Sequence, residues 1–205
     1  MTTRRRGAWH VAPVGQDRWP DLVRLFGRDG AHGGCWCMWW RIPHREFADN
    51  DAARNRAGLR RLVRQGTPPG LLGYQDGEPV AWVSLGPRSD FAALETSRIL
   101  APVDDRPVWS IVCFFVRRDR RRAGWMRRLL SAAIDYAAAH GATMLEGYPI
   151  ECGEGRLAGY AGYTGIASTF RAAGFREVAR RKMDRPLMRR ALRRRASKRG
   201  KEPRG

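Results

Sequence analysis

The part of this sequence best suited to chemistry is an arginine-rich turn around Gly124. Glycine has no Cβ, so a ligand can approach the backbone closely at this position. Open backbone surrounded by positive charge is typical of a polyphosphate site. The turn lacks the Gly-Lys-Ser/Thr of a P-loop and the Gly-x-Gly-x-x-Gly of a dinucleotide-binding fold, so both motifs are excluded. Seven arginines fall between positions 117 and 128: Arg117, Arg118, Arg120, Arg121, Arg122, Arg127 and Arg128.

Two regular elements position this turn. Residues 109–116 are apolar, β-branched or aromatic apart from Ser110, which is typical of a strand covered on both faces. Residues 126–140 predict a helix that ends at Gly141, because their apolar side chains form one stripe. The turn therefore leads into a helix start, where unpaired N–H groups and the helix dipole attract an anion. The stripe consists of Met126, Leu129, Leu130, Ala133, Ile134 and Ala137.

This stretch resembles the acetyl-CoA motif of the GNAT superfamily of N-acetyltransferases. The family motif is Arg/Gln-x-x-Gly-x-Gly/Ala between a strand and a helix. Val116, Arg121 and Gly124 follow it in order, and a Leu-Leu pair comes next, as in the family. Residues 170–175 end in Gly-Phe, like a later helix of that family. The resemblance extends over positions 70 to 180.

Two residues depart from the family pattern. Met126 stands where glycine or alanine is usual, and Phe170 stands where the family often has a tyrosine acid. The resemblance implies an α+β (mixed α/β) GNAT fold, in which helices flank a central mixed, mostly antiparallel sheet with a βαβ acetyl-CoA unit. It also implies an acetyl-CoA-dependent N-acetyltransferase, which acylates a primary amine of a small molecule or a protein lysine by direct attack.

The resemblance assigns the cofactor contacts as well. The backbone of Phe114, Phe115 and Val116 would hold the pantetheine arm and polarise the thioester. Arg121 would fix the turn, and backbone N–H groups after it would bind the pyrophosphate. Acetyl-CoA is therefore expected as co-substrate, and no metal is expected. The residues assigned to the pyrophosphate are Arg122, Ala123, Gly124, Trp125, Met126 and Arg127.

The segment 33–40 is dense in aromatic side chains and allows two interpretations. Cys35 and Cys37 are separated by one residue and no second pair follows, which matches a zinc site poorly. Large aromatic rings usually pack in a core. In GNAT proteins, however, the segment after the first strand tends to form the wall of the substrate pocket. Both interpretations apply to Trp36, Trp39 and Trp40.

The general base is assigned to Glu146. Residues 143–149 predict a strand next to the central one, and a desolvated carboxylate there would be a stronger base. The alternative is that one of the many arginines pairs with Glu146. Glu151 and Asp105 are weaker candidates, because loop carboxylates are usually solvated.

The general acid is assigned to Tyr163. Phe170 cannot donate a proton, whereas Tyr160 and Tyr163 lie in a glycine-rich segment just before the predicted helix at 164–173. A phenol is protonated at neutral pH and can therefore donate to a departing thiolate. Packing of these tyrosines in the loop, with water as the proton source, stays an alternative.

The remaining elements complete a chain of alternating strands and helices. Strands are predicted at 9–14, 71–74, 79–85, 175–178 and 187–190, and Asp76-Gly77 predicts a hairpin turn. Helices are predicted from Trp19 to Gly27 and at 50–65. We expect residues 1–190 to form a single GNAT-like domain and residues 191–205 to be a basic, disordered tail.

The charge of the chain bears on its partners. A net charge of +19 indicates anionic partners such as a nucleotide cofactor, acidic substrates, nucleic acid or a membrane surface. A GC-rich genome would also favour arginine, and lysine occurs only at 182, 198 and 201. The basic surface allows one alternative function, a GNAT-fold protein associated with nucleic acid or aminoacyl-tRNA. The departures at Met126 and Phe170 favour another, a CoA-binding regulatory protein with little catalysis.

The compartment is predicted from what the sequence lacks. It has no apolar run of membrane-spanning length and no apolar segment behind its basic start, so we expect no membrane span and no signal peptide. Its four cysteines do not form a disulfide framework, which indicates a cytoplasmic protein. A homodimer is left open.

Overall fold

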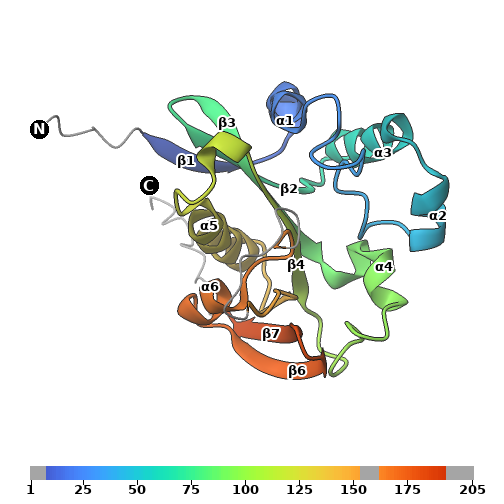
Figure 1. Ribbon diagram of the computed structural model, residues 1–205, viewed down its shortest axis with the longest axis vertical. Helices are drawn as coiled ribbons and strands as arrows, with labels where there is room; N and C mark the ends of the chain where they lie inside the picture. Colours follow the sequence, from blue (N-terminus) through green and yellow to red (C-terminus); the bar gives the residue numbers. More distant parts are fainter. Residues whose placement is uncertain (1–7, 153–161, 193–205) are drawn as a thin grey trace, which may run out of the picture.

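The computed structural model describes residues 8–152 and 162–192 (Figure 1). A seven-stranded sheet runs through it in the order β1-β2-β3-β4-β5-β7-β6. The pair of β4 and β5 is parallel, and the other neighbouring pairs are antiparallel. This is the mixed, mostly antiparallel sheet that the sequence predicts. The strands are β1 (Trp9–Pro13), β2 (Gly70–Gln75), β3 (Glu78–Pro87), β4 (Trp109–Val116), β5 (Met144–Gly147), β6 (Arg176–Lys182) and β7 (Arg185–Ala191).

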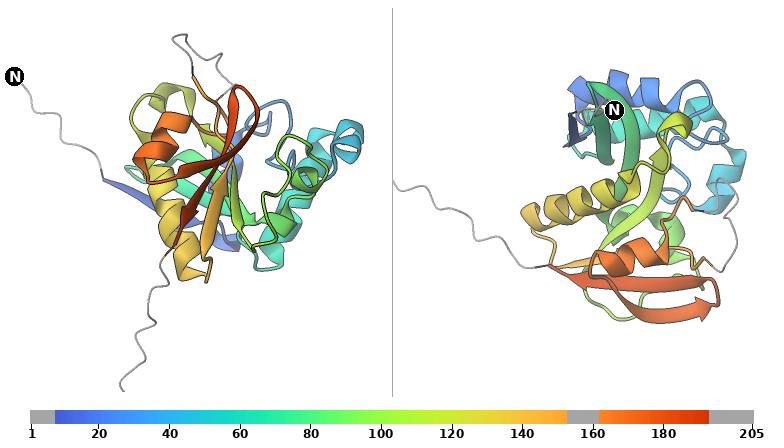
Figure 2. Two further views of the ribbon diagram at one scale, coloured as in Figure 1. Left: turned by 90° about the horizontal axis from the view of Figure 1, so that it is seen from below. Right: turned by 60° about the vertical axis from the view of Figure 1, so that its left-hand side comes forward.

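Helices cover both faces of this sheet. The apolar sides of α5 and α6 pack into a core on one face, and those of α1 and α3 pack into a second core on the other. Figure 2 shows α6 lying against the hairpin of β6 and β7. Within the described parts of the chain, no helix is both long and apolar enough to span a membrane. The helices are α1 (Trp19–Phe26), α2 (His44–Asp49), α3 (Ala52–Arg64), α4 (Ala92–Glu95), α5 (Trp125–Ala139) and α6 (Ala167–Ala172), with short 3-10 turns η1 (Gln16–Arg18), η2 (Arg88–Asp90) and η3 (Arg118–Arg120).

The strand–turn–helix–strand unit forms as predicted. β4 has the predicted bounds, α5 buries the predicted apolar stripe, and β5 returns parallel to β4. Gly141 adopts a left-handed φ of 83°, which ends the helix. Asp76 and Gly77 both have positive φ angles, as a two-residue hairpin turn between β2 and β3 requires.

A β-bulge interrupts β4 directly before its last residues. The register with β3 shifts between Ser84 and Leu85, so that Val112 is an extra residue. Val112 and Cys113 consequently both pack on the α1 side of the sheet, whereas Phe114 packs on the α5 side. Pairing of β4 with β5 ends nearby, at the pair of Ile111 and Gly147. The two parallel strands are therefore paired at one end only.

Several predicted boundaries are wrong by a few residues. The helix predicted at 50–65 begins at Ala52, because the Asp51 side chain accepts a hydrogen bond from the Arg54 N–H and caps it. The separate helix α2 was not predicted, since its six residues are too few to show a period. β6 runs further than predicted because it is an exposed, charged edge strand without an apolar alternation.

The predicted boundary between domain and tail lies inside a strand. Ala191 pairs with Met144 in the sheet, and the Leu192 N–H donates to the carbonyl of Thr143 at 2.8 Å. The ordered chain thus continues past residue 190. The rest of the predicted tail, residues 193–205, lies outside the described residues.

Phe170 is a fully buried ring held between two glycines. A Cβ at Gly147 or at Gly165 would collide with this ring. Phe114 and Phe175 contact it edge-on, with ring centroids 6.1 Å and 4.9 Å away. The ring therefore joins β5, β4 and α6 in one core, and it has no path to a substrate.

This packing predicts a strong effect at Gly147. Gly147→Ala should lower the free energy of unfolding by about 1–3 kcal/mol, because the added methyl group forces Phe170 out of place. Chemical denaturation measures the change. Phe170→Leu in the Gly147→Ala background should recover part of the loss, since the smaller side chain leaves room for the methyl group. Additive effects of the two substitutions would contradict the contact.

Candidate active site

The arginine-rich turn presents open backbone at the start of α5. Gly124 has a left-handed φ of 79°, and a Cβ there would meet no atom within 4 Å. No side chain caps the amino end of α5, which leaves the N–H groups of its first turn for a ligand. Nε of Arg121 donates to the carbonyl of Val116 at 3.2 Å, and this bond ties the turn to the end of β4.

The charges of this turn are largely uncompensated. Arg117 and Arg120 both pair with Asp119, with N–O distances of 2.7 Å and 3.3 Å. Arg128 lies over the rings of Trp9 and Trp125. The other arginines of the turn have no carboxylate partner among residues 8–152 and 162–192. A left-handed glycine, an uncapped helix start and unpaired guanidinium groups together fit a pyrophosphate. These unpaired arginines are Arg118, Arg121, Arg122 and Arg127.

The end of β4 exposes a backbone edge next to this turn. The Phe114 N–H points away from β3 and donates to the carbonyl of Tyr163 at 2.6 Å. By strand alternation the N–H of Val116 faces the same side, while that of Arg117 returns to β3 and donates to the Val80 carbonyl. No residue of β5 pairs with β4 beyond Ile111. An extended, amide-containing ligand arm can therefore pair with this edge.

Tyr163 lies beside this edge together with Trp39. Burial raises the pKa of the Tyr163 phenol, and the Trp39 side chain forms a hydrogen bond with it. Cys113 and Arg185 are close enough to act on the phenol electrostatically. The structure thus brings together the predicted general acid, Tyr163, and a predicted residue of the substrate pocket, Trp39, which are far apart in the sequence. The alternative donor, Tyr160, lies outside the described residues.

The three tryptophans of the aromatic segment divide into two roles. Trp36 is 2% exposed and packs against Trp19 and Phe26, so it is a core residue and cannot line a pocket. Trp40 is also buried, in the small core around Val112. Trp39 is 37% exposed and stacks on His44, with ring centroids 4.3 Å apart. Trp39 alone of the three presents its ring at the surface.

Cys37 of the aromatic segment meets Cys113 of β4. The Cys37 thiol lies 3.8 Å from the sulfur of Cys113, and the indole N–H of Trp82 donates to Cys37 at 2.9 Å. Burial raises the pKa of the Cys37 thiol. All four cysteines are free thiols. Across the described residues, no group of three His, Cys, Asp or Glu side chains is placed to hold a metal ion.

Glu146 is fully buried between two arginines. Its Oε1 accepts hydrogen bonds from Arg88 at 2.9 Å and from the Tyr148 hydroxyl at 2.5 Å, and its Oε2 accepts one from Nε of Arg189 at 2.7 Å. The Tyr148 hydroxyl also lies 2.8 Å from Oγ of Ser110 on β4. Both carboxylate oxygens are occupied and the side chain has no exposed surface. The geometry thus favours the pairing alternative over the role of a base.

One of the two weaker base candidates also has structural partners. Glu151 accepts hydrogen bonds from Arg171 and Arg180, and these bonds lower the pKa of its carboxyl group to about 2. Asp105 lies in the irregular segment before β4. Neither residue lies beside the β4 edge.

Comparison with known proteins decides the family. Residues 35–148, more than half of the chain, match the model of the Acetyltransferase (GNAT) family. The chain belongs to this family. It is therefore an acyltransferase. No curated protein matches the sequence of this acetyltransferase.

Solved acetyltransferases share the fold at low sequence identity. YncA of Salmonella typhimurium, solved with acetyl-CoA, is 16% identical, with a TM-score of 0.52 over 93% of this chain and 97% of its own. PaiA N-acetyltransferase of Thermoplasma acidophilum, in complex with coenzyme A, is 8% identical, with a TM-score of 0.52 over 90% and 99%. Ribosomal-protein-alanine N-acetyltransferase of Brucella melitensis is 20% identical, with a TM-score of 0.51 over 89% and 99%. These likenesses show a GNAT fold.

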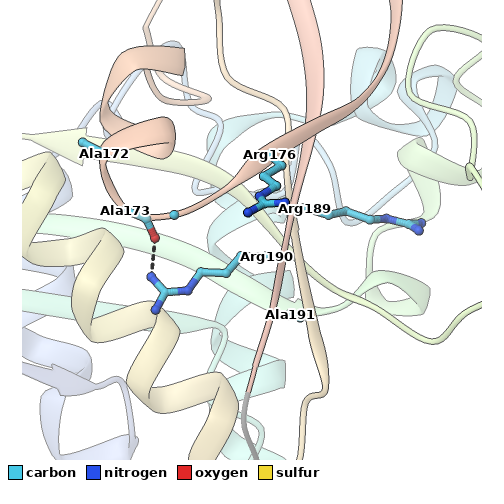
Figure 3. A pocket seen from close by; sticks show the side chains of 7 residues that line it. Ala172, Ala173, Arg176, Arg189, Arg190 and Ala191 are labelled. Carbon is cyan, nitrogen blue, oxygen red and sulfur yellow. Dashed lines mark hydrogen bonds between the residues drawn. The ribbon is translucent and has the colours of Figure 1, made fainter.

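A basic hollow of this acetyltransferase lies away from the predicted site. It has a volume of about 700 Å³ and lies between the end of α6 and the β6–β7 hairpin (Figure 3). Arg190 donates to the carbonyl of Ala173 at its edge, and Arg189 extends to the other side of the sheet. No residue predicted to contact the cofactor or the acceptor lines it. The candidate active site therefore consists of the turn and the β4 edge.

The environment of Glu146 predicts a structural effect. Glu146→Gln should lower the free energy of unfolding by on the order of 3 kcal/mol, because it leaves two buried guanidinium groups with less compensation. Glu95→Gln is the matched control, since it removes an exposed carboxylate from the same Arg88 and should change stability little. Thermal or chemical unfolding measures both variants.

The same variant separates the two interpretations of Glu146. A folded Glu146→Gln protein whose turnover falls by about 10²–10⁴-fold at neutral pH and recovers at high pH would show that Glu146 is the base. If Glu146 is purely structural, we expect the turnover of Glu146→Gln to stay close to that of Glu95→Gln across this pH range.

Proposed function

We propose that this acetyltransferase transfers an acetyl group from acetyl-CoA to a primary amine, on a small molecule or a protein lysine, by direct attack. The observation that carries the proposal is the edge of β4 beyond its pairing with β5, beside the uncapped start of α5. The two features lie on one strand–turn–helix unit. They offer N–H groups both to an amide-containing arm and to a pyrophosphate.

The chain supplies binding and polarisation through its backbone. The N–H groups at the start of α5, with Arg122 and Arg127 nearby, would hold the pyrophosphate. The edge from Phe114 to Val116 would pair with the pantetheine arm. Bound acetyl-CoA supplies a thioester, whose C–S bond breaks as the amine nitrogen forms a bond to the acetyl carbon and loses a proton to water. The Phe114 N–H would stabilise the charge that develops on the carbonyl oxygen.

In the structure, the Tyr163 carbonyl accepts a hydrogen bond from the Phe114 N–H, the group that we propose to polarise the thioester. The thioester oxygen competes for the same donor, so binding requires the Phe114–Tyr163 hydrogen bond to exchange. Tyr163 would then no longer bond to β4 through its backbone, and its side chain would lie near the leaving group. Its phenol, which like any phenol is protonated at neutral pH, can donate the proton that the thiolate needs.

The acceptor enters from the side of Trp39 in this proposal. Trp39 has the exposed ring of the aromatic segment, and its side chain forms a hydrogen bond with Tyr163. An acceptor bound at Trp39 would therefore lie next to the proposed general acid, Tyr163. We also propose a cytoplasmic location, which the four free thiols support. Release of thiol from acetyl-CoA with a panel of amines tests the reaction. Binding of CoA without thiol release from any acceptor would instead support a regulatory CoA-binding protein.

Substitution of Gly124 tests the cofactor site. Gly124→Val should weaken CoA binding by at least about tenfold, because the branched side chain fills the space in front of the helix start. Gly77→Val is the matched control: Gly77 has the same φ of 79° and the same open surroundings, but it lies in the β2–β3 turn. Calorimetry with CoA measures both. Equal affinities in the two folded variants would refute this placement of the pyrophosphate.

Removal of the Tyr163 hydroxyl tests the acid. Tyr163→Phe keeps the backbone carbonyl that contacts Phe114, so CoA affinity should not change. Turnover should fall by about 10²-fold, the lower end of what general acid catalysis supplies. Tyr136→Phe, which alters another half-buried phenol on α5, should leave turnover unchanged. Loss of turnover in Tyr160→Phe but not in Tyr163→Phe would move the assignment to Tyr160.

A further inference from the structure

The outward face of α3 consists of arginine and alanine alone. Successive helix residues are about 100° apart, which places five exposed arginines on an arc of about 160°. Ala53 and Ala57 are the other exposed residues of this arc. The opposite side of the helix is buried through Asn55, Leu59 and Val63. The arginines, called the α3 arginine face below, are Arg54, Arg56, Arg60, Arg61 and Arg64.

None of these guanidinium groups pairs with a carboxylate in the described parts of the chain. Arg56 and Arg60 lie over the rings of Trp36 and Trp19, at 5.3 Å and 5.9 Å from the ring centroids. Some other surface arginines are compensated, since Arg24 pairs with Asp21 and Arg180 pairs with Glu177. The α3 arginine face is thus a second site of unpaired positive charge, on the opposite face of the sheet from α5.

The pattern opposes the stability of the helix that carries it. Arg56 and Arg60, and again Arg60 and Arg64, are like charges four residues apart, which destabilise a helix. A genome rich in G and C exchanges lysine for arginine, but it does not remove glutamate and aspartate from an exposed face. A local pattern that conflicts with helix stability is expected at functional sites.

We propose that the α3 arginine face binds the phosphate backbone of a nucleic acid. A protein interface would need apolar or aromatic anchors on this face, and a membrane surface would need apolar side chains to insert. The face offers neither, because its remaining side chains are methyl groups. Phosphate groups require only closely spaced positive charge, and arginine binds them with two parallel hydrogen bonds.

The position of α3 places such a partner beside the acceptor side of the enzyme. Nδ2 of Asn55 donates to the carbonyl of Gly34 at 3.0 Å, and Arg56 lies over Trp36. The helix is therefore attached to the segment that carries Trp39. α3 and α5 lie on different sides of the molecule in Figure 1, so nucleic acid on α3 leaves the cofactor turn accessible. The proposal goes beyond acetyl transfer and does not depend on it.

The test compares two triple variants of the full chain that lose equal charge. One carries Arg54→Gln, Arg61→Gln and Arg64→Gln, which spares the two arginines that lie over tryptophan rings. The control carries Arg24→Gln, Arg98→Gln and Arg106→Gln, three exposed arginines outside α3. Fluorescence anisotropy with short labelled RNA and DNA duplexes measures the dissociation constant between about 50 and 200 mM salt.

We expect the α3 variant to bind at least about tenfold more weakly at low salt, and its slope of log Kd against log salt to fall by about 2–3. The control should stay within about twofold of the unsubstituted protein. Affinity for CoA should not change in either variant, and the melting temperature of the α3 variant should not fall, because like charges are removed. The RNA and DNA arms show which duplex is preferred.

Three results would overturn the proposal. Equal weakening by both triple variants would show that net charge alone attracts nucleic acid. Absence of binding by the unsubstituted protein would exclude the interaction. Loss of binding to anionic vesicles or an acidic peptide in the α3 variant, with nucleic-acid binding unchanged, would assign the face to another class of partner.

Discussion

The candidate site depends on the ion pairs and hydrogen bonds of one buried carboxylate. This carboxylate lies where β4 and β5 begin to separate. Glu146 pairs with Ser110 in the parallel ladder, one residue before that ladder ends. Through Arg88 it holds η2, and through Arg189 it holds β7. Buried charges persist only when they are paired, so these contacts fix the place where the strands are together. Beyond this place β4 and β5 separate.

The separation exposes the backbone of β4 where chemistry needs it. The bulge at Val112 shifts the following residues, so that the N–H of Phe114 faces the opening and the Cys113 side chain faces the aromatic segment. The same strand then runs into the uncapped start of α5. One short stretch of chain therefore holds at fixed distances the groups that we propose to polarise the thioester, to bind the phosphates and to face the acceptor. The bulge accounts for this, because a regular strand would have kept its ladder closed.

Arginines play at least two different physical roles in the described parts of this protein. Those beside carboxylates, such as Arg189 with Asp104 and Arg180 with Glu177, join elements of the fold. Those in the cofactor turn and on α3 have no such partner among the described residues and create a positive potential instead. These two sets of unpaired arginines thus lie on opposite faces of the sheet.

The sequence by itself determined the strand–turn–helix unit around Gly124, because apolar periodicity and a left-handed glycine are local properties. It also indicated the family, whose motif lies within this unit. Only the tertiary structure decided the partners of Glu146, since Arg88 and Arg189 lie 58 and 43 residues away in the chain. Strand order β3-β4-β5-β7 brings them together, and no local pattern encodes that order. The bulge and the burial of Trp36 likewise follow from packing between distant segments, which the spacing of residues in one segment cannot show.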